Sequence, residues 1–185
     1  ARRITRPEQL PADFALQPAE REFFAAAERS GGRSGLPFAV TRHYASLADP
    51  ADPEDPVRRQ FLPRVQELQA DPTGLGDPLG EQRCQPVPRL LHRYRDRVLL
   101  LVTDLCATYC RHCFRRRGAA GAGRPFLGPE QLARAAAYVG GRSEILELIL
   151  SGGDPLLLSD ARLRSLFARF RWERPDLALR IHTRM

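Results

Sequence analysis

Three cysteines stand close together in the chain, at Cys106, Cys110 and Cys113. Thiolates are natural ligands of iron–sulfur clusters and of zinc. Structural zinc usually takes four ligands in two pairs, but the one other cysteine, Cys84, lies far upstream and is expected to be a packed or exposed thiol. Three thiolates on one short loop suit a [4Fe–4S] cube and leave one iron open to bind a further molecule. A zinc site that includes His112 and a cluster that only carries electrons stay open as alternatives.

A second chemical feature is the turn Ser151-Gly152-Gly153-Asp154-Pro155. Small residues in such a turn let the backbone approach a ligand closely. By itself a turn of this composition is only a turn. Its place, one strand and one helix after the cysteine loop, makes it a candidate for the same site.

The elements around both features alternate between strand and helix. A continuous apolar run at 97–103 predicts a strand that is buried on both faces in a parallel sheet, and residues 145–150 and 178–183 predict a second and a third strand. One helix is predicted from Pro129 to about Val139. A second helix is predicted to follow Ser159, which caps it, and to run through about Trp172. This order predicts an α/β fold, namely the first three strands of a partial parallel β/α, TIM-like barrel. Because chemistry in such barrels sits at the carboxyl ends of the strands, both loops fall where a site is expected. Three strands cannot close a barrel, so we expect a fragment of a longer protein.

The first half of the chain differs in composition and in its predicted elements. It is rich in Pro, and helices are predicted at 20–29, 39–47 and 57–68. Residues 71–90 contain several Gly and Pro residues and predict a long ordered or wrapping segment. The expected organisation is therefore a mostly helical, Pro-rich N-terminal extension over residues 1–91, followed by the truncated start of a barrel over 92–185.

The composition narrows the range of partners. The net charge is +7, but the basic residues are scattered among Asp and Glu, so no nucleic-acid partner is expected. No apolar stretch reaches the roughly 18–20 residues that cross a bilayer, and no secretory signal follows the basic Ala1-Arg2-Arg3. We therefore expect no membrane partner and a cytoplasmic location. All 29 residues in the Lys plus Arg total are Arg. Arg stays protonated, so no side chain here supplies an amine nucleophile.

Cys106-x3-Cys110-x2-Cys113, with the His112 ring before the last cysteine, resembles the signature of radical S-adenosylmethionine (SAM) enzymes. Ser151-Gly152-Gly153-Asp154 resembles the Gly-Gly-Glu/Asp motif of that superfamily. The resemblance implies a [4Fe–4S] cluster on the three cysteines and SAM on the open iron. It also implies SAM contacts from His112, Ser151, Gly152, Gly153 and Asp154.

The resemblance extends further, from about Leu36 onward. Residues 52–60, 77–81 and 86–103 are similar to the lysine 2,3-aminomutase family, most specifically in His92-Arg-Tyr-Arg-Asp-Arg-Val. It implies an isomerase that uses the SAM-derived radical and pyridoxal phosphate (PLP) to move the α-amino group of L-lysine, or a similar amino acid, to the β-carbon. By position, Arg93, Tyr94 and Arg97 resemble residues near the PLP phosphate, and Arg115 resembles the clamp on the substrate carboxylate. Forked Arg donors suit a phosphate. The alternatives to a binding role are structural. Tyr94 would then be a packed ring, and Arg116 and Arg117 would be solvated charges.

Two departures from the family limit this interpretation. The chain has no Lys to hold PLP, so no catalytic residue is assigned within it and the isolated chain is expected to be inactive. Phe114 stands where lysine 2,3-aminomutases usually have Thr. A Phe at this position resembles the related enzyme that acts on a lysyl-lysine of translation elongation factor P. That enzyme is one alternative, and a non-catalytic iron–sulfur or zinc protein is another. The expected partners are an amino acid substrate and an electron donor such as flavodoxin or ferredoxin, and the resemblance allows a homo-oligomer.

Overall fold

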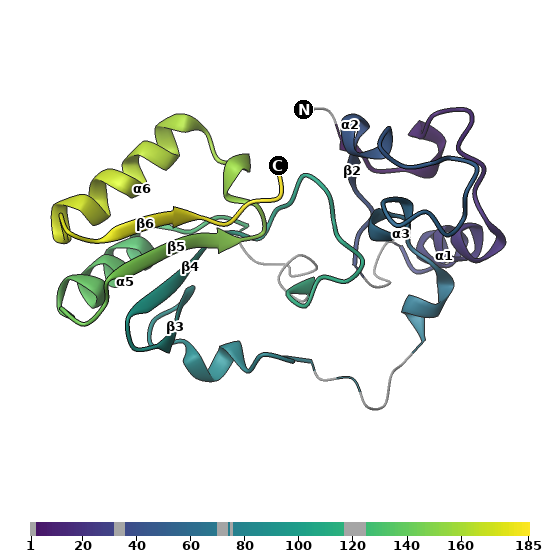
Figure 1. The fold of residues 1–185 in the computed structure, drawn as a ribbon. Coiled ribbons are helices and arrows are strands. Elements are labelled where there is room, and N and C mark those ends of the chain that lie inside the picture. The colour runs from purple at the N-terminus through teal and green to yellow at the C-terminus, as the bar shows by residue number, and fades with distance from the viewer. Residues whose placement is uncertain (1–2, 32–35, 70–73, 75, 117–124) are drawn as a thin grey trace. The chain divides into compact units, whose positions relative to one another are not determined.

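The chain divides into two compact units in the computed structural model, which describes residues 3–31, 36–69, 74, 76–116 and 125–185 (Figure 1). The first unit comprises Ala1–Gly76 and Ala107–Gly121, and the second comprises Asp77–Cys106 and Ala122–Met185. The cysteine loop therefore contributes to both units, since the boundary falls between Cys106 and Ala107. The domain boundary expected at residue 91 stays a prediction about the whole protein.

The second unit is built on a four-stranded sheet with the order β3-β4-β5-β6. Its strands are β3 (Leu90–Tyr94), β4 (Arg97–Thr103), β5 (Glu147–Gly152) and β6 (Ala178–Ile181). Strands β4, β5 and β6 are parallel, while β3 is antiparallel to β4. Because parallel strands share their direction, β4 and β5 end at the same edge of the sheet, where the cysteine loop and the Gly-Gly turn begin.

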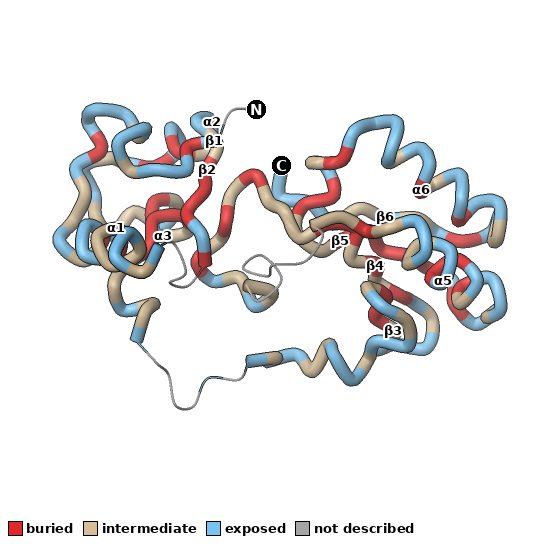
Figure 2. The backbone as a smooth tube through the Cα atoms, turned by 180° about the vertical axis from the view of Figure 1, so that it is seen from behind, coloured by how far each residue is buried: buried red, intermediate tan, exposed pale blue. Residues whose placement is uncertain are grey.

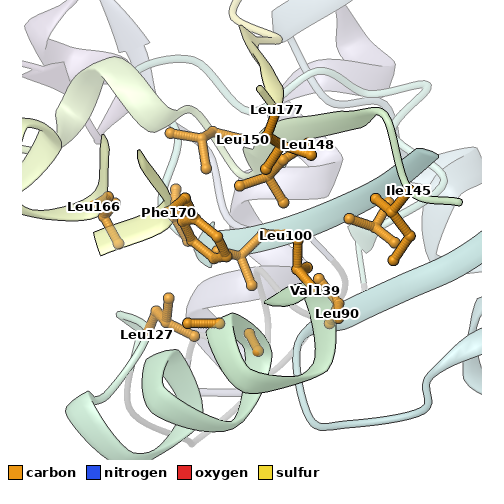
Figure 3. Close-up of a cluster of buried hydrophobic side chains, with 14 of the residues drawn as sticks. Leu90, Leu100, Leu127, Val139, Ile145, Leu148, Leu150, Leu166, Phe170 and Leu177 are labelled. Atoms are coloured by element: carbon orange, nitrogen blue, oxygen red, sulfur yellow. The ribbon is translucent and has the colours of Figure 1, made fainter. Parts of the chain in front are cut away.

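Two helices, α5 (Pro129–Gly140) and α6 (Asp160–Glu173), pack with this sheet around one apolar core. Alternate strand residues such as Leu100, Leu148 and Leu150 are completely buried there with Val139 of α5 and Phe170 of α6 (Figure 3). Alternation sends successive strand side chains to opposite faces, so a single face of β4 meets the helices. The predicted mixed α/β architecture with a parallel sheet is confirmed.

The predicted elements of this unit agree with the structure except at one strand. The strand predicted at 97–103 is confirmed, and those at 145–150 and 178–183 are found as β5 and β6 with shifted ends. Ser159 caps α6 as expected, because its hydroxyl accepts a hydrogen bond from the Arg162 amide at 3.3 Å. The sequence did not indicate β3, which turns into β4 through a tight hairpin at Arg95–Asp96.

The first unit has little regular structure. Its elements are α1 (Pro18–Arg29), short α2 (Arg42–Ala45) and α3 (Arg58–Phe61), the 3-10 turns η1 (Pro7–Gln9) and η2 (Val65–Leu68), and the paired strands β1 (Arg3–Ile4) and β2 (Val40–Thr41). In the second unit, η3 (Glu81–Cys84) precedes β3 and η4 (Pro155–Leu157) follows β5.

Two of the three helix predictions in this unit were wrong in extent. The helix expected over 57–68 is interrupted because Leu62, which precedes Pro63, takes an extended conformation with ψ of 122°. The helix expected over 39–47 shrinks to α2, since Val40 and Thr41 pair with β1 instead. The helix expected over 20–29 is confirmed as α1, which begins two residues earlier at Pro18.

A small apolar core and a buried ion pair hold the first unit together. Val40, Ala45 and Phe61 are completely buried, and Figure 2 shows buried segments, in red, along β2 and α3. Beside them Arg58 and Glu20, with side chains 0% and 1% exposed, form an ion pair of 2.7 Å. Within the described residues of both units, no helix is long and apolar enough to cross a membrane.

Candidate functional site

The cysteine loop starts where β4 ends. Thr103 is fully buried, and its hydroxyl donates to the Pro125 carbonyl at 3.0 Å and accepts from the Leu105 amide at 3.1 Å. The Asp104 amide donates to the same Pro125 carbonyl at 2.7 Å. The three residues before Cys106 are therefore fixed within the second unit. Cys106 itself is half-buried and lies at the carboxyl end of the parallel sheet.

Arg89 supports this start of the loop from the side. Its guanidinium is paired with the Asp104 carboxylate and also donates to the Leu101 carbonyl at 3.2 Å. Its backbone has φ of 67°, a left-handed conformation that is costly for a residue with a side chain. Such strain persists only where the surroundings hold it in place, and it clusters at functional sites.

The Gly-Gly turn after β5 packs directly against the start of the cysteine loop. The Gly153 amide donates to the Thr103 carbonyl at 2.6 Å, and the Asp154 amide donates to the Leu105 carbonyl at 2.7 Å. A Cβ added to Gly153 would lie well inside 3.0 Å of the Leu105 carbonyl. At Gly152, which has φ of +116°, a Cβ would meet the Thr103 carbonyl in the same way. The glycines are thus required for the approach of one backbone to another within the second unit.

Asp154 ties three strand ends together, two through its side chain and one through its main-chain amide. It is 4% exposed, and its carboxylate accepts hydrogen bonds from the Leu156 amide at 3.0 Å, the Thr183 hydroxyl at 2.7 Å and the Arg184 amide at 2.9 Å. Asp154 therefore fixes the exits of β5 and β6 while its own amide holds the loop after β4. The sequence placed Asp154 beside a ligand, whereas the structure shows its side chain bonded within the protein.

The second half of the cysteine loop belongs to the first unit. The Tyr109 amide donates to the Ala39 carbonyl at 2.9 Å, and the Cys113 amide donates to the Cys110 carbonyl at 3.0 Å. The latter bond closes a tight turn with a cysteine at each end. Between these cysteines Arg111 is buried and His112 is exposed. After them Phe114 is exposed, and the Arg115 guanidinium lies 4.7 Å from the centre of its ring.

The donor set fits an iron–sulfur cluster in its chemistry. All four cysteines are outside disulfides, and each is partly accessible. Thiolates are the ligands that such clusters require. No group of three His, Cys, Asp or Glu side chains is assembled around a common metal position in the described part of the chain. The ligand assignment of Cys106, Cys110 and Cys113 therefore stays a prediction that rests on their spacing.

The residues expected near the PLP phosphate lie at the other end of β4. Arg97 is the first residue of that strand, and Tyr94, opposite it on β3, is 61% exposed. The strand has seven residues, so it spans about 20 Å at roughly 3.3 Å per residue. Arg93 donates to the Leu79 carbonyl at 2.7 Å. The hydrogen bond to the Asp96 carboxylate raises the pKa of Arg97 above its usual value. The structure thus does not bring these side chains together with Cys106.

Sequence reasoning missed four residues that position the loop. Arg89 and Asp104 act on its start, and Arg111 and Glu67 act on its second half. The signal for Arg111 was its place between two cysteines, and for Arg89 its place before the apolar strand. Their partners could not be found by spacing, because Glu67 lies 44 residues from Arg111 and Asp104 lies 15 from Arg89. Arg117, mentioned above as a solvated charge, lies outside the described residues.

Comparisons with known proteins point to one family. A family model described as "4Fe-4S single cluster domain" matches residues 95–183. L-lysine 2,3-aminomutase of Clostridium subterminale is 43% identical over 91% of the chain and 39% of its own length. The protein of the same name from Bacillus subtilis is 45% identical over 74% of the chain and 29% of its own length. The chain thus spans well under half of these relatives. Since the matches include both the cysteine loop and the preceding segments, the chain is similar to L-lysine 2,3-aminomutases over nearly all of its own length.

Proposed function

We propose that Cys106, Cys110 and Cys113 hold a [4Fe–4S] cluster in a radical-SAM, PLP-dependent 2,3-aminomutase. The observation that carries this proposal is the hydrogen-bonded contact of the Gly-Gly turn with the start of the cysteine loop, through Gly153 to Thr103 and Asp154 to Leu105. The Gly-Gly turn and the start of the cysteine loop, which are far apart in the sequence, are thus joined by hydrogen bonds. L-lysine, or a similar amino acid, is the proposed substrate, because the relatives bear the name L-lysine 2,3-aminomutase.

Bound together, the cluster, SAM and PLP would supply a radical that removes a hydrogen from the β-carbon and a carbonyl group that carries the migrating nitrogen. The residues of this chain hold and orient these groups. Thr103, Asp104 and Arg89 fix the residues before Cys106, and the Cys110–Cys113 turn presents the other two thiols. The three thiols would ligate three of the four irons of a [4Fe–4S] cluster, and the fourth iron would be left open for SAM.

The SAM contacts are proposed at Ser151, Gly152, Gly153 and Asp154, and at His112. Ser151 is buried at the end of β5, and His112 is exposed beside Cys113. Asp154 would act on SAM through the position of its backbone, since its carboxylate already accepts three hydrogen bonds. The amides of Gly153 and Asp154 also bond to the protein. Carbonyl groups of the turn are thus the atoms that suit an ammonium group.

For PLP and substrate the proposal keeps Arg93, Tyr94 and Arg97 as phosphate contacts and Arg115 as the carboxylate clamp. The sequence contains no Lys, so covalent attachment of PLP would need a residue outside these 185. The whole protein would receive electrons from a donor such as flavodoxin or ferredoxin, act in the cytoplasm and form a homo-oligomer, and no nucleic-acid partner is proposed.

The finer fold proposed for the whole protein is a partial β/α barrel of which β4, β5 and β6 are the first parallel strands. Strand β3 occupies the outer edge of β4 as an antiparallel neighbour. In a closed barrel the last strand would pair with the first at that edge. The arrangement therefore favours an open barrel that continues from β6.

An enzyme that acts on a lysyl-lysine of elongation factor P is the second candidate, and Phe114 favours it. This ring is 45% exposed one residue after Cys113 and is covered by the Arg115 guanidinium. A non-catalytic iron–sulfur or zinc protein is the third candidate, and lack of a response to SAM would favour it.

The test is anaerobic reconstitution of the chain with iron and sulfide, followed by electron paramagnetic resonance (EPR) of the reduced protein with and without SAM. We expect a [4Fe–4S] signal that changes on addition of SAM. Cys106→Ser and Cys110→Ser should each lose nearly all of the signal, because each removes one of three ligands. Cys84→Ser, in η3, is the matched control and should keep it. A signal that ignores SAM, bound zinc in place of iron, or equal loss in Cys84→Ser would contradict the proposal.

A further inference from the structure

Arg111, the residue after Cys110, is anchored by a bidentate ion pair. Its Nε lies 3.0 Å from Oε1 of Glu67, and its Nη2 lies 2.6 Å from Oε2. The same guanidinium donates to the carbonyls of Leu36 at 3.1 Å and Pro37 at 3.0 Å. It also lies 5.5 Å from the centre of the Phe23 ring. The side chain is only 6% exposed, so these partners satisfy a buried charge within the first unit.

The main chain of Arg111 is held as firmly as its side chain. Its amide donates to the Gln60 carbonyl at 2.8 Å, and its carbonyl accepts a hydrogen bond from the Arg116 guanidinium. Arg116 also donates to the Cys113 carbonyl at 3.2 Å. The contacts of Arg111 therefore fix the turn that joins Cys110 to Cys113.

We propose that Arg111 and Glu67 are a positioning pair, which holds the Cys110–Cys113 turn in its cluster-binding conformation before iron arrives. This inference rests on the proposed cluster. Glu67 neutralises the guanidinium and aligns it bidentately, a geometry that neither Lys nor Gln reproduces. A ligand turn that is ordered in advance loses less conformational freedom when it binds metal, so iron is held more tightly. Neither residue touches the iron in this proposal.

The chain supplies a closely matched control in the pair of Arg58 and Glu20. This pair also lies in the first unit, at 2.7 Å, and is even more deeply buried. The Arg58 guanidinium likewise donates to two carbonyls, those of Ala15 and Pro50, each at 2.8 Å. It also lies 4.9 Å from an aromatic ring, that of Phe14. The described contacts of this pair include none with the cysteine turn.

The experiment compares Glu67→Gln and Arg111→Lys with Glu20→Gln and the unaltered chain. Each protein is reconstituted with iron and sulfide, and the rate of iron release to a ferrous chelator is measured well below its unfolding temperature. EPR line shape and reduction potential of the cluster are recorded on the same samples. Changes to groups that orient metal ligands typically weaken metal binding by about 10- to 100-fold. We therefore expect iron release about 10-fold faster in Glu67→Gln and Arg111→Lys, with altered EPR line shapes. Glu20→Gln should stay within about twofold of the unaltered chain.

Equal acceleration in Glu20→Gln would mean that the pair acts only through the stability of the first unit, and would overturn the proposal. Release rates and line shapes unchanged in Glu67→Gln would also overturn it, whether or not Arg111→Lys folds. An unaltered chain that binds no cluster at all would instead refute the proposed function and, with it, this inference. The two failures are distinguished by the unaltered chain alone.

Discussion

The two units of this chain achieve order in different ways. In the second unit, Val98, Leu100, Leu148 and Leu150 are essentially fully buried in a continuous apolar core beneath two helices. In the first unit most elements are short, and two Arg–Glu pairs with buried guanidinium groups lie among them. The cysteine loop has residues in both units. Cys106 follows a rigid strand, whereas Cys110 and Cys113 lie on irregular chain that side chains must hold.

The difference has a physical cause in the main chain. Strands and helices satisfy their own amides and carbonyls, but irregular chain leaves carbonyls that need other donors. A guanidinium has five N–H donors in a fixed fork and suits this purpose. Arg58 and Arg111 each donate to two carbonyls of the first unit. A composition with Arg and no Lys is therefore well matched to such a unit.

The comparison predicts that a different kind of substitution destabilises each unit. Phe170→Ala should destabilise the second unit by about 3–5 kcal/mol, because it leaves a cavity in the apolar core. Glu20→Gln should destabilise the first unit by about 3–5 kcal/mol, because it leaves the buried Arg58 charge uncompensated. Hydrogen exchange read by segment is the measurement, since it reports each unit separately.

Exchange should rise across β4–β6 in Phe170→Ala and around α1 and α3 in Glu20→Gln. Asp176→Asn, on the exposed surface of the second unit, is the control and should leave exchange at neutral pH nearly unchanged. Equal increases across the whole chain for either core variant would show that the units unfold together and would break the comparison.

A smaller effect is expected where the second unit holds the cysteine loop. Gly153→Ala would place a methyl group well inside 3.0 Å of the Leu105 carbonyl. Overpacking of this kind typically costs about 1–3 kcal/mol. We expect lower stability together with weaker iron retention, because Leu105 adjoins Cys106. Denaturant unfolding and iron content are the measurements.

Gly141→Ala is the control for Gly153→Ala. Its added methyl group would make an ordinary contact of 3.5 Å with the Ala137 carbonyl. If both variants behave alike, the contact between the Gly-Gly turn and the loop is not what positions Cys106.

The smallest effect concerns surface ion pairs, of which each unit has an example. The Arg174 guanidinium hydrogen-bonded to Asp176 lowers the pKa of that carboxyl to about 2. In the first unit, Arg64 likewise lowers the pKa of Glu54. A lowered pKa means that the folded state favours the carboxylate. The stabilisation is therefore present above the unfolded pKa of Asp176, about 3.8, and is lost as pH falls toward about 2.

Asp176→Asn should remove this part of the pH dependence and change stability little, since exposed pairs contribute little. The measurement is the unfolding midpoint of both proteins between pH 5 and pH 2, with an NMR titration of the carboxyl. A carboxyl of Asp176 that titrates at its ordinary value would contradict the prediction.

The sequence by itself determined most of the second unit and the candidate ligands. An apolar run such as 97–103 can be satisfied only by burial, so strand β4 could be recognised without its neighbours. Local signals also marked Ser159 as a cap and Cys106, Cys110 and Cys113 as a set. Strand β3 escaped notice because its end, Arg93-Tyr94, is exposed and polar or amphipathic, so no apolar pattern marks it.

Only the tertiary structure decided how those ligands are held. Arg111 meets Glu67 across 44 residues, and Asp154 meets Thr183 across 29. The sequence suggested that Gly152 and Gly153 leave room for a ligand, which stays a prediction, and the structure adds that they leave room for the carbonyls of Thr103 and Leu105. Local pattern reports which side chains must be buried or capped. It does not report which distant groups satisfy a buried charge or a main-chain carbonyl, because that choice is made when the elements pack.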